Sequence, residues 1–415
     1  MKIIVLLLLS LFIFSCTSKK NEVFQWRSEN RKGIFPEQNL LKEWPENGPE
    51  ELWVLDSIGD GYGSPTITNT EIFVTGAIDS IATIFCISFD GKIKWQAPFG
   101  KEWIKNYAGS RSQPTVVNDL IYVGSGMGNL FCLKRENGNI VWQKDFTKDF
   151  DGVYPRLGHS EAPLIDEDKV FWTPGGKRYN VVALNRFTGE LIWSNKGHGE
   201  RSSYNPGTLI ELSSRKIFVT FSAYNMMGFD TETGKLLWTH AQDNTAPEER
   251  RVGIGDTHCN CVIFEDGYIY YAAGDGNGGV KLQLSEDGTE ITEMWRNKEF
   301  DSYMGGIVKI ENHLYGSGTS KKQFKSIDAD TGEITDSLKL GWGALVAADD
   351  MFYYYGQNGK LSLLSYNENG EIAAKGTFKI THGTKEHFSH PVLKDGVLYQ
   401  RRGQALMAYN VKRSG

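Results

Sequence analysis

Short apolar stretches alternate with polar turns along most of the chain, and the alternation repeats. Each repeat begins with a Pro or a substitute for it, followed by an apolar strand, a polar turn and a second apolar strand. The clearest copies are residues 65–76, 114–125, 163–174 and 391–402. Weaker copies begin near Pro206, Cys261, Ile307 and Val346. The eight starts lie 39 to 55 residues apart, a period typical of repeat folds with four short strands per unit.

The second half of each repeat carries a turn that leads to a Trp. In "ALNRFTGELIW" (183–193) and "GFDTETGKLLW" (228–238), an Asn or Asp precedes Thr-Gly, and the Trp follows four residues after the Gly. The same spacing occurs at Gly91/Trp95 and Gly138/Trp142, with a stretched copy at Gly288/Trp295. The Gly supplies the positive φ that a bulged hairpin turn requires. The fixed spacing predicts that the Trp rings pack between neighbouring sheets, rather than binding a ligand at the surface.

Eight such repeats predict an all-β fold: an eight-bladed β-propeller with four-stranded blades, formed by residues 23–412 as a single domain. The last repeat runs from Pro391 to about Val411 and stops after its third strand. Ring closure therefore requires an N-terminal strand that pairs with the last blade. The stretch "VFQWR" (23–27) has a suitable apolar and aromatic pattern, and we expect it to close the ring with Trp26 at the packing position.

The composition is that of an ordinary globular protein rich in turns and aromatic residues. Of the 415 residues 40% are hydrophobic and 23% charged, and Gly (46) is far more frequent than Pro (12). The formal net charge of −6 argues against a nucleic-acid-binding protein.

The first residues differ from the rest of the chain. "MKIIVLLLLSLFIFSC" has one Lys and an apolar run that is too short to span a membrane but fits the core of a signal peptide. The small residue followed by Cys16 resembles the lipobox of bacterial lipoproteins. The resemblance implies that residues 1–15 are removed, that Cys16 is lipidated and that residues 16–22 are a tether. A plain signal peptide or membrane anchor is the alternative.

The Trp-ended repeat resembles the tryptophan-docking motif of quinoprotein-type propellers. "FQWRSENRKGIFPE" followed by "LLKEWPENGPEELW" resembles the opening of the PQQ-binding-like propeller repeat family, which includes lipoproteins similar to BamB. This resemblance implies a non-catalytic scaffold in the cell envelope, anchored to the outer membrane and facing the periplasm. Its partners would be envelope proteins or nascent outer-membrane proteins.

Two other functions are compatible with the same fold. One is a PQQ-dependent dehydrogenase with PQQ and calcium in the channel. Its family usually carries adjacent cysteines over the cofactor, whereas Cys259 and Cys261 are separated by Asn260, and no Cys-x-x-Cys-His haem motif occurs. The other is a small-ligand or carbohydrate-binding propeller. We therefore assign no catalytic residue, metal or cofactor, and keep both functions as alternatives.

The remaining cysteines have more than one interpretation. In "DTHCNCV", His258, Cys259 and Cys261 form a set that soft metals favour, but small apolar core residues or a strained disulfide are alternatives. Cys86 and Cys132 occupy the small-residue position of the third strand, and we expect packing to explain them.

Candidate binding residues lie in the segments that link each blade to the next. In a propeller these links run inward, so the residues just before each repeat should surround the channel mouth. The predicted set is Tyr62, Arg111, His159, Tyr204, His258, Tyr303, Trp342 and His387, with Glu161 and His390 close by. Such a site would hold an anionic or ring-shaped ligand through Arg111, with affinity falling above about pH 6.5 as His loses its charge. The alternative is that each residue only caps its own blade.

Overall fold

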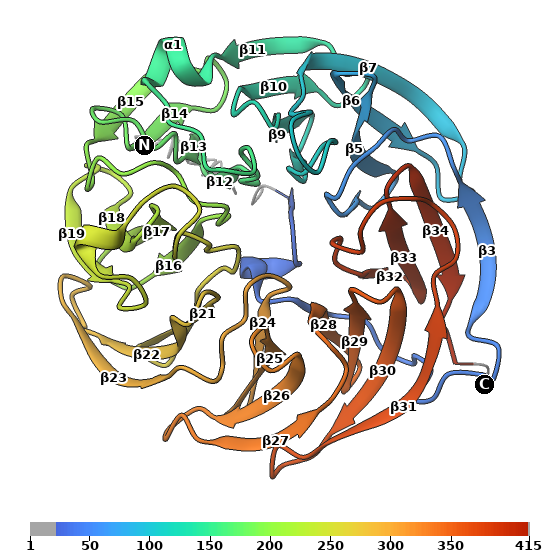
Figure 1. The fold of residues 1–415 in the computed structure, drawn as a ribbon. Coiled ribbons are helices and arrows are strands. Elements are labelled where there is room, and N and C mark those ends of the chain that lie inside the picture. Colours follow the sequence, from blue (N-terminus) through green and yellow to red (C-terminus); the bar gives the residue numbers. More distant parts are fainter. Residues whose placement is uncertain (1–21, 414–415) are drawn as a thin grey trace, which may run out of the picture.

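The computed structural model describes residues 22–413, which form eight β-sheets arranged in a ring (Figure 1). The first four blades are β4 (Thr66–Ile67), β5 (Ile72–Ile78), β6 (Ile81–Ile87) and β7 (Ile93–Lys101); β8 (Thr115–Val117), β9 (Leu120–Gly124), β10 (Leu130–Lys134) and β11 (Ile140–Lys144); β12 (Leu164–Asp166), β13 (Lys169–Trp172), β14 (Val181–Asn185) and β15 (Leu191–Asn195); and β16 (Thr208–Glu211), β17 (Lys216–Phe221), β18 (Asn225–Asp230) and β19 (Leu236–Ala241).

The second half of the ring continues the same order. Blades 5 to 8 are β20 (Ile263–Glu265), β21 (Tyr268–Ala273), β22 (Gly278–Leu284) and β23 (Ile291–Asn297); β24 (Ile307–Ile310), β25 (His313–Gly318), β26 (Gln323–Asp328) and β27 (Ile334–Leu338); β28 (Gly343–Ala348), β29 (Met351–Gly356), β30 (Lys360–Tyr366) and β31 (Ile372–Lys379); and β32 (Val392–Lys394), β33 (Val397–Arg402) and β34 (Ala405–Asn410), completed by β3 (Glu50–Leu55). The predicted eight-bladed propeller with four-stranded blades is confirmed.

An N-terminal strand closes the ring, as predicted, but it is not residues 23–27. The closing strand is β3, which pairs antiparallel with β34 along Glu50–Leu55. Trp53 takes the packing position: it lies opposite Ala408, and its indole Nε1 donates to the carbonyl of Phe89 in blade 1 at 2.8 Å. The assignment of Trp26 to this role is wrong, because β1 (Val23–Phe24) pairs instead with β8, the inner strand of blade 2.

The repeated Trp residues connect neighbouring blades, which confirms the packing role predicted for them. Opposite five of the rings on the third strand is a small residue, in the pairs Cys86–Trp95, Cys132–Trp142, Ala183–Trp193, Gly228–Trp238 and Ala408–Trp53, whereas Trp295 lies opposite Lys281. The indoles of Trp53, Trp142, Trp193, Trp238 and Trp295 each donate to a backbone carbonyl of the following blade, at 2.8 to 3.2 Å. A small residue is needed there because it leaves room for the ring. Cys86 and Cys132 are therefore packing residues.

The middle of the ring is filled by the N-terminal plug, residues 23–35, which comprises β1, the 3-10 helix η1 (Glu29–Arg31) and β2 (Ile34–Phe35). β2 pairs in parallel with β28, so the plug joins blade 2 to blade 7. Several of its residues adopt positive φ without being Gly, including Arg27 (59°) and Arg31 (58°). Such conformations carry strain and persist only where surrounding contacts hold them.

Two buried arginines supply those contacts. Arg27 donates to carbonyls of blades 7 and 6, and Arg31 to carbonyls that precede blades 4 and 3: Leu345 (2.6 Å), Ile307 (2.6 Å), Gly207 (2.8 Å) and Pro163 (2.9 Å). Burial lowers the pKa of Arg27 to about 10, so its guanidinium remains protonated at neutral pH. Hydrogen bonds to carbonyls offset part of the cost of burying these charges. The plug therefore ties opposite sides of the ring together.

Only short helices interrupt the links between blades. α1 (Phe146–Phe150) follows blade 2 and is capped by Asp145, whose carboxylate accepts from two backbone amides. The 3-10 helix η2 (Pro247–Glu249) follows blade 4. Within residues 22–413, no helix has the length and apolar character needed to cross a membrane. Cys16 and the predicted signal peptide lie outside the described residues.

Candidate functional site

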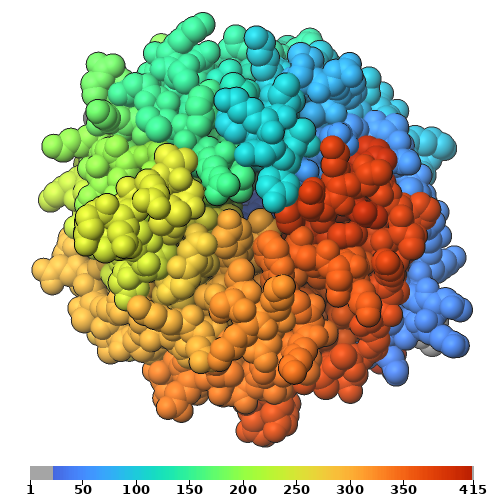
Figure 2. Space-filling model, in the orientation of Figure 1, coloured from blue at the N-terminus to red at the C-terminus, as the bar shows by residue number. Residues whose placement is uncertain are grey.

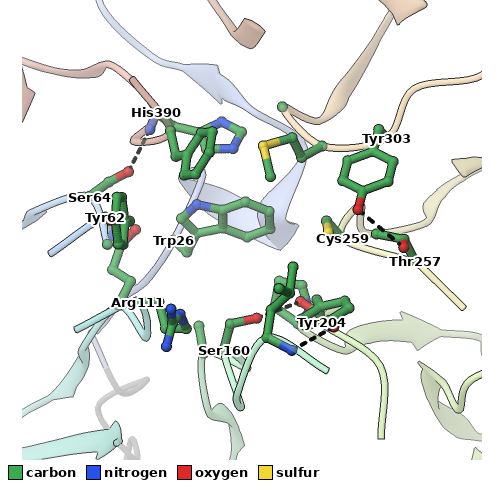
Figure 3. Close-up of a pocket in the computed structure, with 18 of the residues that line it drawn as sticks. Trp26, Tyr62, Ser64, Arg111, Ser160, Tyr204, Thr257, Cys259, Tyr303 and His390 are labelled. Atoms are coloured by element: carbon green, nitrogen blue, oxygen red, sulfur yellow. Dashed lines mark hydrogen bonds between the residues drawn. The ribbon is translucent and has the colours of Figure 1, made fainter. Parts of the chain in front are cut away.

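The links between blades converge at one end of the ring and surround a cavity of about 300 Å³ (Figures 2 and 3). Every one of the eight links contributes to it. One residue from each link is Tyr62, Arg111, Ser160, Tyr204, Cys259, Tyr303, Trp342 and His390. Trp26 of the N-terminal plug lies in the middle of this circle and forms the floor. The predicted convergence of the links is thus what the structure shows.

The cavity wall is rich in aromatic rings, and three of its four tyrosine hydroxyls are already engaged. The Tyr62 hydroxyl donates to the Glu386 carboxylate at 3.0 Å. Tyr204 accepts from the backbone N–H of Leu157 at 3.1 Å, and Tyr303 accepts from the Thr257 hydroxyl at 3.3 Å. Burial raises the pKa of Tyr303 to about 12, so this phenol is neutral at physiological pH. The wall therefore provides rings more than free hydroxyl groups.

Arg111 is the cationic side chain among the described residues that line the cavity. Its guanidinium lies 6.0 Å from the centre of the Tyr62 ring, and Nη2 donates to the carbonyls of Asn106 and Tyr107. Nη1 is buried and has no hydrogen-bond partner in the described structure. Burial lowers the pKa of Arg111, and the charge of nearby Glu102 opposes this shift.

Glu102 does not hydrogen-bond to that guanidinium. Its two oxygens accept instead from the hydroxyl of Ser110 (2.7 Å) and from the backbone amides of Gly126 (2.6 Å) and Trp103 (2.8 Å). The guanidinium of Arg111 therefore has no directly bonded carboxylate, and Glu102 acts on it only through its charge. A buried cation in this state gains from an anion that binds beside it.

The predicted set divides into residues that line the cavity and residues that do not. Tyr62, Arg111, Tyr204, Tyr303 and Trp342 line it, and so does His390. His159, His258 and His387 do not, so their placement at the mouth is wrong. In all three links the error is one position, since Ser160, Cys259 and Phe388 line the cavity. Successive side chains of an extended segment point in opposite directions, so a shift of one position changes the side.

The three misplaced histidines have other environments. His159 packs against Trp172 with ring centres 4.5 Å apart, and His258 stacks on Phe221 at 4.4 Å. His387 hydrogen-bonds to the hydroxyl of Tyr355. Burial lowers their pKa values to about 4, 3 and 4 respectively. They are neutral at pH 6.5, so the histidine basis for the expected pH dependence of binding is absent.

The cavity does not fit PQQ with calcium. Calcium takes six to eight oxygen ligands, mostly carboxylates and carbonyls. No Asp or Glu is found among the described residues that line the cavity. Nowhere in residues 22–413 do three His, Cys, Asp or Glu side chains come together as a set that suits a metal ion. Cys261 is buried, and its thiol donates to the carbonyl of Pro206 at 3.0 Å.

Three aromatic residues of the cavity were missed by the sequence interpretation. Tyr107 and Phe388 lie in links whose predicted residue was another side chain, and Trp26 was assigned to closure. A signal for Trp26 did exist. Two segments, 23–27 and 50–55, compete for the closing position, and only the second is long enough for a full outer strand. Trp26, in the shorter segment, is therefore not needed to close the ring.

Comparisons with known proteins agree with this architecture. The family model described as outer membrane protein assembly factor BamB matches residues 82–338, more than half of the chain. The outer membrane protein assembly factor BamB of Shewanella oneidensis is 21% identical over 320 residues, which are 72% of this chain and 70% of that protein. The quinoprotein alcohol dehydrogenase PedH of Pseudomonas putida is 22% identical over 54% of this chain, but only 35% of its own length is covered.

Solved structures show the same fold. BamB from Moraxella catarrhalis superposes with a TM-score of 0.62 and 15% identity, covering 87% of this chain and 99% of that structure. A europium-containing methanol dehydrogenase superposes with a TM-score of 0.63 and 12% identity, covering 92% and 90%. At such identities these likenesses establish the propeller and not an activity. The family model extends over most of the ring, and the chain belongs to the outer membrane protein assembly factor BamB family.

Proposed function

We propose that this protein is a non-catalytic binding protein of the cell envelope, held at the outer membrane by a lipid on Cys16. It acts as a scaffold for envelope proteins or nascent outer-membrane proteins, as the names of its relatives suggest. The lack of calcium ligands around the cavity favours this role over a PQQ-dependent dehydrogenase.

One observation carries the proposal: a loop beside the cavity mouth exposes aliphatic side chains although its backbone is firmly held. This apolar loop comprises residues 250–256, between blades 4 and 5. Val252 is 54% exposed and Ile254 39% exposed. A loop whose backbone is already fixed loses little conformational freedom when a protein partner covers its exposed aliphatic groups.

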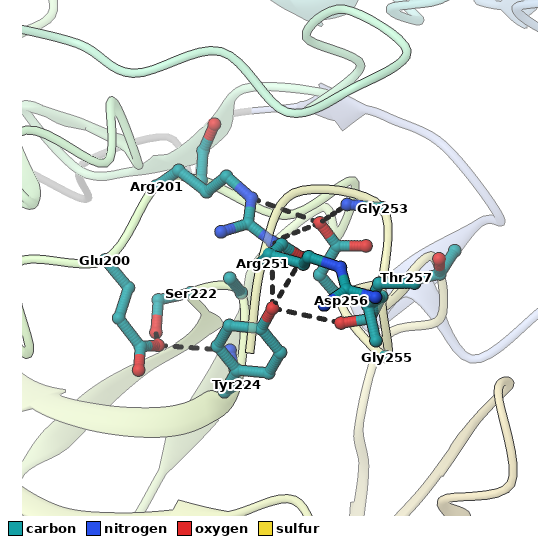
Figure 4. Close-up of polar contacts among 12 residues, drawn as sticks. Glu200, Arg201, Ser222, Tyr224, Arg251, Gly253, Gly255, Asp256 and Thr257 are labelled. Atoms are coloured by element: carbon teal, nitrogen blue, oxygen red, sulfur yellow. Dashed lines mark hydrogen bonds and ion pairs between the residues drawn. The ribbon is translucent and has the colours of Figure 1, made fainter. Parts of the chain in front are cut away.

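Contacts below the apolar loop fix its backbone (Figure 4). The Tyr224 hydroxyl lies 2.8 Å from the carbonyl oxygen of Arg251 and 3.0 Å from that of Ile254. Arg201 forms an ion pair with Asp256, and the same carboxylate accepts from the backbone amide of Gly253 at 2.9 Å. These bonds use the polar groups of the loop internally. Its apolar tips are left to face outward.

Neighbouring links extend this surface. Gly253 lies beside the side chain of Arg156, and the amide of Asn106 reaches the carbonyl of Arg156 at 3.5 Å. Ile104, on the same link as Asn106, is 57% exposed. Lys105, Arg156 and Arg251 are exposed cations among these aliphatic groups. The surface therefore fits a partner segment that combines apolar and acidic side chains.

The test is co-purification from solubilised membranes of the native host. The parent protein should retain components of the outer-membrane protein assembly machinery. The double variant Val252→Asp/Ile254→Asp should retain them at least about tenfold less, because it places two charges in the apolar contact.

Phe187→Asp is the matched control. Phe187 is 50% exposed, and it lies in the hairpin between β14 and β15, away from the links that form the mouth. This variant should behave like the parent. The scaffold proposal fails if the parent captures no assembly component, or if the loop variant captures as much as Phe187→Asp does.

A further inference from the structure

The cavity is closed at its base by the N-terminal plug. Trp26 lines the cavity, whereas its neighbours Gln25 and Arg27 line a second hollow on the other side of the plug. The Trp26 ring is held by an edge-to-face contact with His390, with ring centres 5.0 Å apart. A molecule that enters from the mouth therefore reaches an aromatic floor and does not pass through the ring (Figure 3).

The wall disfavours a polyhydroxylated ligand such as a sugar. Such ligands need many free donors and acceptors, and here most are used internally. Besides the engaged tyrosines, Ser160 donates to the carbonyl of Tyr204 at 3.2 Å. Ser64 accepts from the backbone amide of His390 at 2.8 Å. A ligand whose hydroxyls find no partner loses more on leaving water than it gains.

The wall favours a flat ring. Tyr303 and Trp342 meet edge to face at 5.9 Å, and Tyr62, Tyr107 and Phe388 form a second aromatic group with ring centres 5.4 to 6.5 Å apart. The two groups belong to links on different parts of the ring and both line the cavity. Aromatic rings of a ligand gain both buried area and directional ring contacts in such a place.

The charge inside the cavity favours one acid group. Arg111 lines the cavity, its Nη1 has no hydrogen-bond partner in the described structure, and the nearby Glu102 carboxylate acts on it through its charge without bonding to it. We propose that the cavity binds a small aromatic carboxylate: a one-ring or two-ring molecule that stacks between the aromatic groups and places its acid group on Arg111. This site is separate from the apolar loop and does not depend on the scaffold role.

The experiment is calorimetric titration of the full-length chain, purified in mild detergent, with four probes. Benzoate and 1-naphthoate carry the proposed chemistry, benzamide replaces the acid by a neutral amide, and glucose represents the polyhydroxylated class. Benzoate should bind with a Kd below about 1 mM, and 1-naphthoate more tightly because it buries more ring area. Benzamide should bind about tenfold to a hundredfold more weakly than benzoate, the usual effect of a buried charge-assisted hydrogen bond. Glucose should give no heat of binding.

Two variants test the assigned residues. Arg111→Met should abolish the preference for benzoate over benzamide, and Trp342→Ala should weaken both ring ligands by about tenfold or more. Arg178→Met is the control, because the Arg178 side chain is 77% exposed and does not line the cavity. The Val252→Asp/Ile254→Asp protein should bind benzoate normally, which separates this site from the scaffold surface.

Three results would overturn the proposal. One is that neither benzoate nor 1-naphthoate binds the parent with a Kd below about 1 mM. Another is equal binding of benzoate and benzamide by the parent, which needs no variant to fold. The third is an unchanged preference for benzoate in Arg111→Met.

Discussion

Replacing Trp53 by Ala should destabilise the propeller at its closure. Trp53 is on the strand that completes blade 8, and its contacts join the last blade to the first. Its ring lies over Gly91, where an added Cβ would come within 2.7 Å of the indole, and its centre is 6.0 Å from that of Tyr399. Removing the ring leaves β3 paired with β34 but without its packing across the seam between blades.

The magnitude follows from the partial burial of the ring. A fully buried Trp replaced by Ala costs about 3–5 kcal/mol, and Trp53 is only half-buried, so about 2 kcal/mol is expected from packing. The hydrogen bond to the carbonyl of Phe89 is also lost. Phe89 is exposed, so water replaces the donor and the loss is at the low end, about 0.5 kcal/mol. The free energy of unfolding should therefore fall by about 2–3 kcal/mol.

Equilibrium urea unfolding, followed by far-ultraviolet circular dichroism, measures this change. Leu52→Ala is the matched control, because Leu52 is on the same strand with a side chain that is 46% exposed, and its cost should stay within about 0.5 kcal/mol. Static light scattering should also show earlier aggregation of Trp53→Ala, since a loosened closing strand uncovers the edge of β34. A Trp53→Ala protein as stable as Leu52→Ala would refute the assignment of the closure to residues 50–55.

Further outcomes follow from the anchor, the cofactor test and the buried histidines. Cys16→Ala should release the protein from the membrane fraction or leave it unprocessed at the inner membrane; mature protein in the outer-membrane fraction would disprove lipidation at this residue. Addition of PQQ and calcium should produce neither dye-linked alcohol oxidation nor a rise in melting temperature, and either effect would restore the enzymatic alternative. Binding of benzoate should be constant between about pH 5.5 and 8, because burial lowers the pKa of His390, the histidine among the described lining residues, well below its usual value and Arg111 remains protonated; a loss of affinity through pH 6.5 would contradict this. His258 is buried with a folded pKa of about 3, below its unfolded value of about 6.5, so its contribution to stability is present above pH 6.5 and decreases as the pH falls toward 3. When the pH is lowered from 7 to 5, the free energy of unfolding of His258→Phe should therefore fall by about 2 kcal/mol less than that of the parent. Urea unfolding at both pH values measures this difference.

The blades were predictable because each repeat has the same types of residue at the same positions, where the fold requires them. A Gly at positive φ makes the hairpin turn, and a small residue such as Ala183 leaves room for the ring of Trp193 opposite it. The periodicity therefore established the number of blades and the role of the Trp rings. The choice of closing strand failed, because a two-residue strand at Val23–Phe24 and a six-residue strand at Glu50–Leu55 both contain the apolar and aromatic residues that the pattern requires.

The cavity was only partly predictable, because its residues lie outside the repeating part of each blade. The convergence of the links follows from the topology of a propeller, and Arg111 and four of the predicted aromatic residues line the cavity. The side on which a linker residue lies depends on local backbone conformation, which periodicity does not determine; hence His258 was chosen where Cys259 faces the cavity. The floor depends on the N-terminal plug, where Trp26 is positioned by bonds from Arg27 to carbonyls 318 and 280 residues away in the chain. Contacts of that kind leave no local pattern. The part of the molecule most open to functional variation is thus the part that the repeat constrains least.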